Sequence, residues 1–561
     1  MANRKNENEN ASTSNGKQAA SQRRGRSNAN SADSIRQRPE RYLVAARPPH
    51  LLPPGARALD EPDALFDWLS DQPDIRLVSR LSRGPGPGAG IESACPEIAV
   101  VEMPADRARA LRGSVQLLVE PDMPLSYTDP NPVVSPLALP DPGVAVPFPE
   151  PVHVSFRVMD NKNVPLEGVG VSLLGANWPV HGRTGADGCV VLQLPADTLE
   201  TVRSLFVRPK QDHWSIWVDR PELAGDAENV VVVRRMSETF EQFPHRQVTG
   251  WGYEAMGLDR IPPTHRAHGV RVAVLDSGVD VNHPDLAERI VGGFDFVADN
   301  DSTWNVDEVG HGTACAGVIT GTDNGAGIAG IAVDAEVHAC KIFPNGRFSD
   351  LIRALDYCIE REIDIAHLSL GSPNASELVA LKILDACNAG VACVAPAGNS
   401  GGMVTFPGTL PTVLTVAALG KIGEFPADSQ HTRETQGWPT TAEGYFSPSF
   451  TCFGHEVNVC APGVAIPTAV PPDGYAPQDG TAIAAAHITG LAALVLAHHD
   501  GFRDWFRARN AARIGHLFQA IGSSCSPIAF GDVHRTGAGL PNAALALGLT
   551  VPQMQSATSA R

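Results

Sequence analysis

The chain has 561 residues, 43% of them hydrophobic and 19% charged, which is enough for about three domains with sizeable cores. Its net charge is −18, and no basic motif recommends a nucleic-acid partner. Ten cysteines are scattered without a CxxC pair, which argues against a disulfide framework or a zinc site and favours buried free thiols.

Residues 1–40 are rich in Asn, Ser, Arg and Gln and are predicted to form a disordered tail. They contain no apolar core of the kind that a secretory signal needs. The longest apolar stretch, residues 484–497, is too short to span a bilayer. We therefore expect no membrane partner and a cytoplasmic location.

Residues 41–128 show a βαββαβ rhythm that predicts a small ferredoxin-like α+β sheet, an unrelated α+β domain being the alternative. The strands are expected at 42–45, 75–81, 96–103 and 115–119, and the helices at 61–69 and 105–111. Residues 129–151 follow as an extended, proline-rich linker, with eight prolines between 130 and 151.

Residues 152–236 contain short alternating strands separated by turn signals, which predict a small β-sandwich. This part resembles the carboxypeptidase-regulatory-like modules found in many proteins. The sequence leaves its role open between spacing, substrate docking and partner binding.

Residues 237–549 alternate apolar strands with helical stretches, which predicts an α/β unit with a parallel sheet and helices on both faces. A short tail, 550–561, follows. The run from Val272 to Asp276 is typical of a buried parallel strand that ends in an acid, at the edge where such sheets carry functional residues. The polar stretch 421–446 is expected to be a surface insertion.

Three further segments carry chemistry. His311 lies in Gly-His-Gly-Thr, 35 residues after Asp276, and opens an apolar run of small residues as a helix start does. Asn399 follows the apolar strand at 391–394, and Gly-Thr-Ala482 precedes the longest apolar stretch. The order is therefore acid, imidazole, amide, and then the Gly-Thr-Ala segment.

These motifs in this order resemble the subtilisin-like serine proteases, peptidase family S8, with Ala482 at the position of the nucleophilic serine. The resemblance implies that Asp276 orients His311, that His311 is the general base, and that Asn399 donates to the developing oxyanion. Losing the serine hydroxyl costs a subtilisin about a million-fold in turnover.

The resemblance also identifies residues 41–128 as an inhibitory propeptide whose final segment lies in the substrate groove like a product strand. Cleavage is predicted after Tyr127 or within the linker. Ser369, Leu370 and Gly371 match one wall of the first specificity pocket, where the backbone binds the substrate. The implied partners are protein or peptide substrates and the chain's own propeptide.

A structural calcium ion is a further implication, because Asp285 and Asn324 match calcium ligands of many relatives. A plain surface loop is the alternative. His487 matches a family histidine and is interpreted as a helix-packing residue, preceded here by Ala486 where the family usually has proline.

Two explanations of Ala482 remain open. The serine of an active protease was replaced on purpose, or the chain is a natural pseudoprotease that binds peptides without cutting them. The retention of Asp276, His311 and Asn399 favours the first. The expected function is thus a serine endopeptidase made as a self-processing zymogen and inactive in this form. The alternative is a peptide-binding or scaffold protein.

Overall fold

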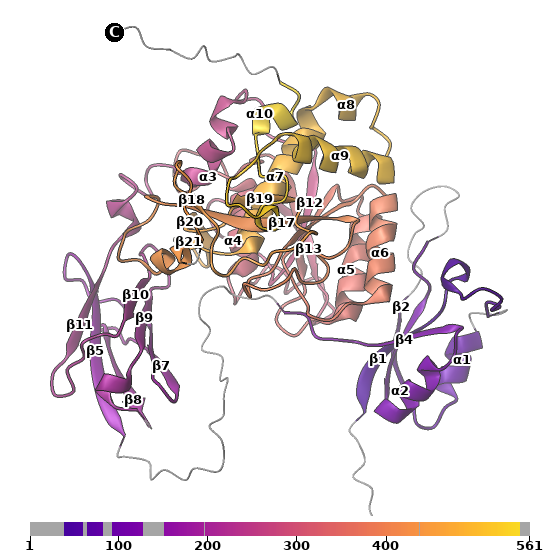
Figure 1. The fold of residues 1–561 in the computed structure, drawn as a ribbon, viewed down its shortest axis with the longest axis horizontal. Helices are drawn as coiled ribbons and strands as arrows, with labels where there is room; N and C mark the ends of the chain where they lie inside the picture. Colours follow the sequence, from indigo (N-terminus) through magenta and orange to yellow (C-terminus); the bar gives the residue numbers. More distant parts are fainter. Residues whose placement is uncertain are drawn as a thin grey trace, which may run out of the picture.

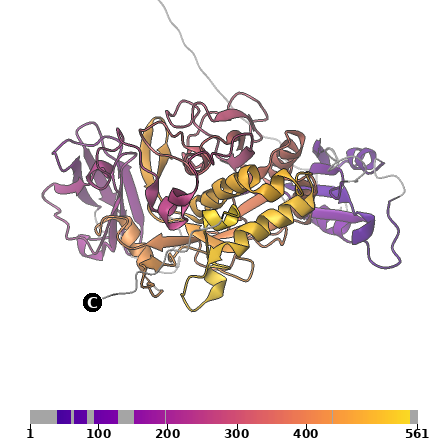
Figure 2. The same cartoon turned by 90° about the horizontal axis from the view of Figure 1, so that it is seen from above.

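A computed structural model describes residues 39–59, 64–81, 93–126, 151–195, 197–436 and 438–549. Three units follow one another along the chain. The N-terminal unit and the β-sandwich lie at opposite ends of a large central unit (Figures 1 and 2). The expected tails before residue 39 and after residue 549 lie outside the described residues, as do Tyr127 and the proline-rich linker up to residue 150.

The central unit is built on a sheet with the strand order β13-β14-β12-β15-β16-β17-β18, with β19 also paired to β17. All pairs are parallel except β17–β18. Strands β15 and β16 are buried at every position, as expected for apolar strands covered on both faces. The strands are β12 (Arg271–Asp276), β13 (Ile290–Asp295), β14 (Glu336–Lys341), β15 (Ile365–Leu368), β16 (Ala392–Pro396), β17 (Val413–Lys421), β18 (Tyr445–Phe446) and β19 (Val459–Pro462).

Helices cover both faces of this sheet, so the predicted α/β class is confirmed. Helices α4 (His311–Thr320), α7 (Thr481–His498) and α9 (Ala511–Ser523) share one apolar core with the sheet. Helices α5 (Phe348–Glu360) and α6 (Glu377–Asn388) form the second core on the opposite face. Helix α7 has the length and apolar composition of a membrane span, but 89% of it is buried inside the fold, as in the core helix of a globular unit.

The smaller elements of the central unit connect and close this framework. They are α3 (Gly250–Ala255), α8 (Asp500–Arg503), α10 (Ala543–Ala546), β20 (Ile466–Val470), β21 (Gly474–Gln478), β22 (Cys525–Ser526) and β23 (Leu540–Pro541). Strands β20 and β21 form an antiparallel hairpin directly before α7.

The N-terminal unit is an antiparallel sheet in the order β2-β3-β1-β4, with two helices on one face. Its elements are β1 (Glu40–Ala46), α1 (Ala64–Ser70), β2 (Arg76–Leu81), β3 (Ile98–Met103), α2 (Ala105–Arg112) and β4 (Leu117–Pro121). The chain order is the βαββαβ order that the sequence suggested, and the predicted start of the first helix at Glu61 lies outside the described residues. Alternate side chains, such as Leu43 and Val100, join the apolar core that α5 and α6 form.

The β-sandwich has one sheet in the order β11-β5-β8 and a second in the order β10-β9-β6-β7. The strands are β5 (Val152–Asp160), β6 (Gly170–Leu174), β7 (Pro179–Arg183), β8 (Cys189–Leu194), β9 (Ser204–Arg208), β10 (Ile216–Asp219) and β11 (Asn229–Val233). In β5 the side chains of Val154, Phe156 and Val158 are buried between the sheets, which gives the alternation seen in the sequence.

The expectation that residues 421–446 form a surface insertion is partly wrong. Ser429 pairs with Ile216 of the β-sandwich, and the N–H of Gln430 donates to the carbonyl of Ser215 at 3.0 Å. His431 is fully buried and lies 2.8 Å from the carboxylate of Asp479. These polar residues are covered because the β-sandwich docks on them, which hydropathy alone cannot reveal.

Candidate active site

The residues singled out in the sequence converge at the carboxyl ends of parallel strands. Asp276 ends β12, His311 begins α4, Asn399 follows β16, and Ala482 is the second residue of α7. Helix α4 meets β12 closely because Gly312 has no side chain. A Cβ there would come within 2.1 Å of the Gly278 carbonyl oxygen.

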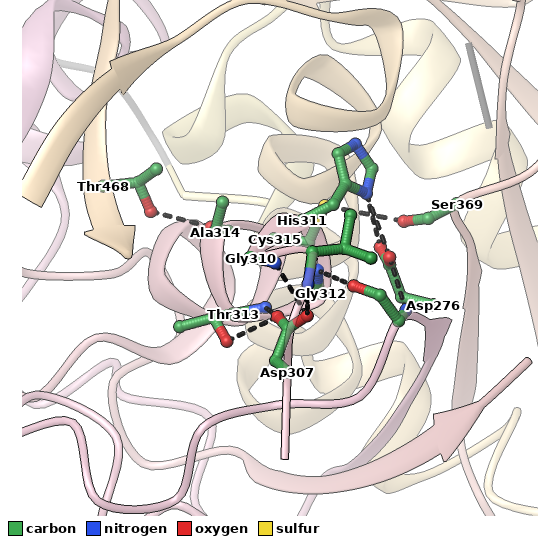
Figure 3. A network of polar contacts seen from close by, with 12 residues as sticks. Asp276, Asp307, Gly310, His311, Gly312, Thr313, Ala314, Cys315, Ser369 and Thr468 are labelled. Atoms are coloured by element: carbon green, nitrogen blue, oxygen red, sulfur yellow. Dashed lines mark hydrogen bonds and ion pairs between the residues drawn. The ribbon is translucent and has the colours of Figure 1, made fainter. Parts of the chain in front are cut away.

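Asp276 and His311 form a hydrogen-bonded pair (Figure 3). The imidazole Nδ1 lies 3.0 and 2.8 Å from the two carboxylate oxygens of Asp276, which is fully buried. Burial raises the pKa of Asp276, but the charge of His311 and hydrogen bonds from His311, Ser369 and Ser277 outweigh it. The net pKa of Asp276 therefore lies below its ordinary value. The carboxylate stays ionised and can fix the imidazole and stabilise its protonated form.

A second acid, Asp307, anchors the helix that carries His311. One of its oxygens accepts from the N–H of Gly310 at 2.7 Å, and the other accepts from the N–H and the hydroxyl of Thr313 at 2.9 and 2.6 Å (Figure 3). This cap satisfies donors in the first turn of α4 and holds His311 in place. Asp307 was not among the residues predicted from the sequence, although an acid just before a helix start is a recognisable signal.

Asn399 is oriented by the residue before Ala482. The N–H and hydroxyl of Thr481 both donate to Asn399 Oδ1, at 2.9 and 2.7 Å. The amide oxygen thus faces α7, and the Nδ2 donor lies on the other side of the group. The Thr481 hydroxyl also accepts from the N–H of Gly398 at 3.2 Å, so it holds the loop together and is not placed as a nucleophile.

Ala482 lies at the amino end of α7, where the helix dipole and its first N–H groups favour negative charge. The turn into this helix needs Gly480, whose φ of 149° is rarely adopted by other residues. One pocket brings Ala482 together with His311, Ser369, Leu370, Gly371 and Asn399. The pocket thus places the hydrogen-bonded Asp276–His311 pair and the Asn399 amide around the methyl group of Ala482.

Ser369 was predicted to act through its backbone alone, but its side chain also takes part in the site. Its side chain supports Asp276 by a hydrogen bond and contacts the Cys315 sulfur at 3.5 Å. By contrast, His487 lies inside α7 and its Nδ1 meets the carbonyl of Ile483 at 2.9 Å. Burial lowers the pKa of His487 to about 4, so it is a neutral packing residue.

A segment of the N-terminal unit already occupies the groove beside this pocket. The Gly371 N–H donates to the Ser126 carbonyl at 2.9 Å, and the Ser126 hydroxyl donates to the Gly371 carbonyl at 3.1 Å. The Leu125 N–H donates to the Gly346 carbonyl at 2.8 Å, and the Leu125 side chain is buried. The segment thus lies as an extra strand between two edges of the central unit, which is how grooves bind extended peptides.

Two carboxylates fasten the same segment to helix amino ends. Asp122 accepts from the N–H and hydroxyl of Ser349 in α5, at 2.9 and 2.8 Å. Glu120 accepts from the N–H groups of Glu377 and Leu378 in α6, at 3.0 and 3.3 Å. Because helix amino ends attract anions, these contacts position the strand in the groove. Neither acid was among the site residues predicted from the sequence.

The residues matched to a calcium site do lie together. The buried Asp285 accepts from the N–H of Ile328 at 2.8 Å and lies 3.4 Å from the Asn324 amide. The amide nitrogen of Gln247 meets the carbonyls of Thr322 and Ile328 at 2.7 and 3.3 Å. The amide oxygens of Asn324 and Gln247 accept from the N–H groups of Ala326 and Gly325, so both amides have to turn to present oxygen to an ion. With that turn, the set offers the carboxylate, amide and carbonyl oxygens that calcium prefers.

Comparisons with known proteins agree with this geometry. Residues 267–512 match the model of the subtilase family. The chain is 31% identical over 263 residues to subtilisin NAT of Bacillus subtilis subsp. natto, covering 46% of this chain and 62% of that protein. It is 30% identical over 263 residues to subtilisin of Bacillus pumilus, covering 46% of this chain and 86% of that protein. It is also 34% identical over 249 residues to M-protease of Shouchella clausii strain KSM-K16, covering 43% of this chain and 58% of that protein.

The chain thus spans less than two thirds of the length of several curated relatives that it matches. The matched region holds every candidate residue from Asp276 to Ala482. On these matches and this fold, the chain belongs to the subtilase family.

Proposed function

We propose that this fold is that of a serine endopeptidase whose nucleophile is replaced by Ala482 in this chain. The observation that carries the proposal is the intact Asp276–His311 pair, with the Asn399 amide, around one missing hydroxyl at the amino end of α7. In the parent with serine, His311 takes the hydroxyl proton as the oxygen attacks the scissile carbonyl. Asp276 stabilises the imidazolium, and Asn399 donates to the oxyanion. The imidazolium then gives its proton to the leaving amine as the C–N bond breaks and the acyl-enzyme forms. Water, deprotonated by His311, hydrolyses this ester and regenerates the serine.

We further propose that the N-terminal unit is the enzyme's propeptide and that the parent processes itself. Support comes from the strand at Leu125 and Ser126, which pairs with Gly371 beside the Ala482 pocket, and from the two carboxylates that cap α5 and α6. A covalently attached strand in the groove competes with other substrates, so the uncut chain is autoinhibited.

The test is Ala482→Ser in the full chain. We expect cleavage of casein and a shortened chain with a new amino terminus near residue 128, with a rate gain of about a million-fold over the alanine form. The matched control is Ala482→Ser with His311→Ala, which keeps the hydroxyl but lacks the base. An active enzyme that stays full-length refutes the propeptide proposal alone, whereas a folded but inactive serine form refutes the endopeptidase.

The second candidate function, a natural peptide-binding pseudoprotease, is favoured by the strand already seated in the groove beside Ala482. It predicts that the serine form binds peptides but does not turn them over. The codon at position 482 of the source gene separates the two candidates independently, because a serine codon is expected only for the protease.

We also propose a structural calcium ion held by Asp285, Asn324, Gln247 and the two loop carbonyls, because these side chains and carbonyls contact one another around one point of the loop. A chelator is then expected to lower the melting temperature of the chain but not of an Asp285→Asn variant. Equal melting with and without chelator argues for a plain loop.

We propose a reducing, cytoplasmic location. The ten cysteines are free thiols, which supports this proposal.

A further inference from the structure

A cavity of about 400 Å³ lies between the β-sandwich and the central unit. Its walls come from the loop before α4, from the β20–β21 hairpin, and from strands β6, β7 and β9 with the residues after β9. His311 lines this cavity and also lines the pocket that holds Ala482 and Ser369. The two hollows therefore meet at the imidazole.

The direction of the bound strand shows what such a cavity receives. The described part of this strand reaches Ser126, which pairs with Gly371, and it comes from the N-terminal unit, at the opposite end of the central unit from the β-sandwich (Figure 1). A peptide that follows this strand past Ala482 has to leave across His311. Since an extended chain advances about 3.3 Å per residue, its next few residues reach the cavity. The cavity is thus the binding place for residues that follow the scissile bond.

The β-sandwich wall of this cavity is basic. Three exposed cations line it, namely Arg183, Arg208 and Lys210. Arg183 also donates to the Gly168 carbonyl at 3.2 Å, and the ammonium end of Lys210 lies beside the same glycine. In a chain whose net charge is −18, such a cluster beside the candidate active site is unusual.

The acids in the same cavity offset this charge only in part. Asp307 and Asp479 are buried, and their oxygens accept hydrogen bonds from α4 and from His431 and the Ala465 N–H. Glu308 is the exposed acid among the lining residues. The side chains that can reach a ligand are therefore positive on balance.

A solvated basic surface is the ordinary explanation of three neighbouring cations. Two observations point to a ligand site. The cations line a concave space that reaches the catalytic imidazole, and His213, which lines the same space, has a buried Nε2 without a hydrogen-bond partner in the described residues. Both features are those of a recognition site for a polar, extended ligand.

We propose that the β-sandwich recognises the part of a protein substrate that follows the scissile bond and selects acidic side chains there. This inference rests on the proposed protease function and gives that site its substrate class. The chain's own sequence agrees with it, because Asp129 lies two positions after Tyr127, where cleavage is expected. The inserted domain then has a catalytic purpose that a mere spacer lacks.

The test uses the full Ala482→Ser chain and quenched peptides that share one sequence before the cut. The second residue after the cut is Glu, Gln or Lys. We expect kcat/KM for the Glu peptide to exceed that for the Gln peptide roughly 5- to 20-fold, with Lys lowest. Added salt is expected to shrink the difference because it screens exposed charges.

The charge-reversed variant Arg183→Glu with Lys210→Glu is expected to invert the order of the three peptides. Its control is Arg203→Glu with Arg220→Glu, which makes the same charge change on exposed β-sandwich residues outside the cavity. The inference is overturned if all three peptides are cut equally, or if both variants change the preference alike. If no peptide is cut at all, the proposed protease function itself fails.

Discussion

Two regions dock on the central unit in contrasting ways. The N-terminal unit is held by its sheet face on α5 and α6, by two carboxylates at helix amino ends, and by a strand in the groove. The β-sandwich is held by Trp214, which is 1% exposed within the main core, and by a stretch around His431 that it covers. The former places a strand beside the candidate active site, whereas the latter lines the cavity next to it.

The two kinds of contact differ in how readily they allow a unit to separate from the central unit. In the proposed self-processing, a substrate strand and water replace the strand and the two capping carboxylates once the linker is cut, and the N-terminal unit leaves. A tryptophan inside the core of its neighbour cannot leave without opening that core. We therefore expect the β-sandwich to remain a permanent part of the enzyme.

The largest effect is expected at the permanent contact. Trp214→Ala should destabilise the chain by about 3–5 kcal/mol, because it empties a large buried site shared by two units. Denaturant unfolding measures this loss. The control is Trp217→Ala on β10, a partly exposed ring that stacks on Arg433 and should cost far less. Equal losses would show that Trp214 does not join the two units.

Acid should loosen the central unit that both regions share. Burial lowers the pKa of His367 and of His487 to about 4, below the ordinary 6.5. As the pH falls, these histidines are protonated in the unfolded chain before they are protonated in the folded chain. Their contribution to the free energy of unfolding is therefore complete above pH 6.5 and is lost as the pH falls toward 4. Each contributes up to roughly 3 kcal/mol.

Urea unfolding between pH 7.5 and pH 4 measures this loss. His487→Gln, which cannot gain charge, should flatten the decline in the free energy of unfolding. An unchanged slope in that variant would mean that His487 does not contribute to the acid sensitivity.

The smallest effect is expected at the releasable contact. Asp122→Ala removes two hydrogen bonds to Ser349 and should weaken the local contact by about 1–3 kcal/mol. Amide hydrogen exchange at the first turn of α5 should speed up roughly 5- to 150-fold. Glu102→Gln, which loses only an exposed pair with Arg76, is the control and should leave that turn unchanged. Equal exchange rates in both variants would show that Asp122 does not stabilise the docking contact.

The sequence predicted the features that depend on local pattern. The buried strand that ends at Asp276, the helix that begins at His311 and the apolar helix after Ala482 all follow from hydrophobic runs and small residues. Motif order identified the family, which the comparisons then established.

Contacts between distant segments could not be predicted in this way. Asp122 and Glu120 look like ordinary surface acids until α5 and α6 present their amino ends. The stretch around His431 looks exposed until the β-sandwich covers it. Nothing local indicates that Arg183 and Lys210 line a cavity with His311. Such features depend on how whole units dock.

Covalent labelling by a fluorophosphonate tests most directly whether the site lacks only a hydroxyl. The Ala482→Ser chain is labelled, and the product is measured by intact mass and peptide mapping. If His311 and Asp276 already form a working base beside position 482, one label per chain is expected on that serine, and His311→Ala should abolish it. A folded serine form that takes up no label at residue 482 would contradict the claim that the site lacks only a hydroxyl.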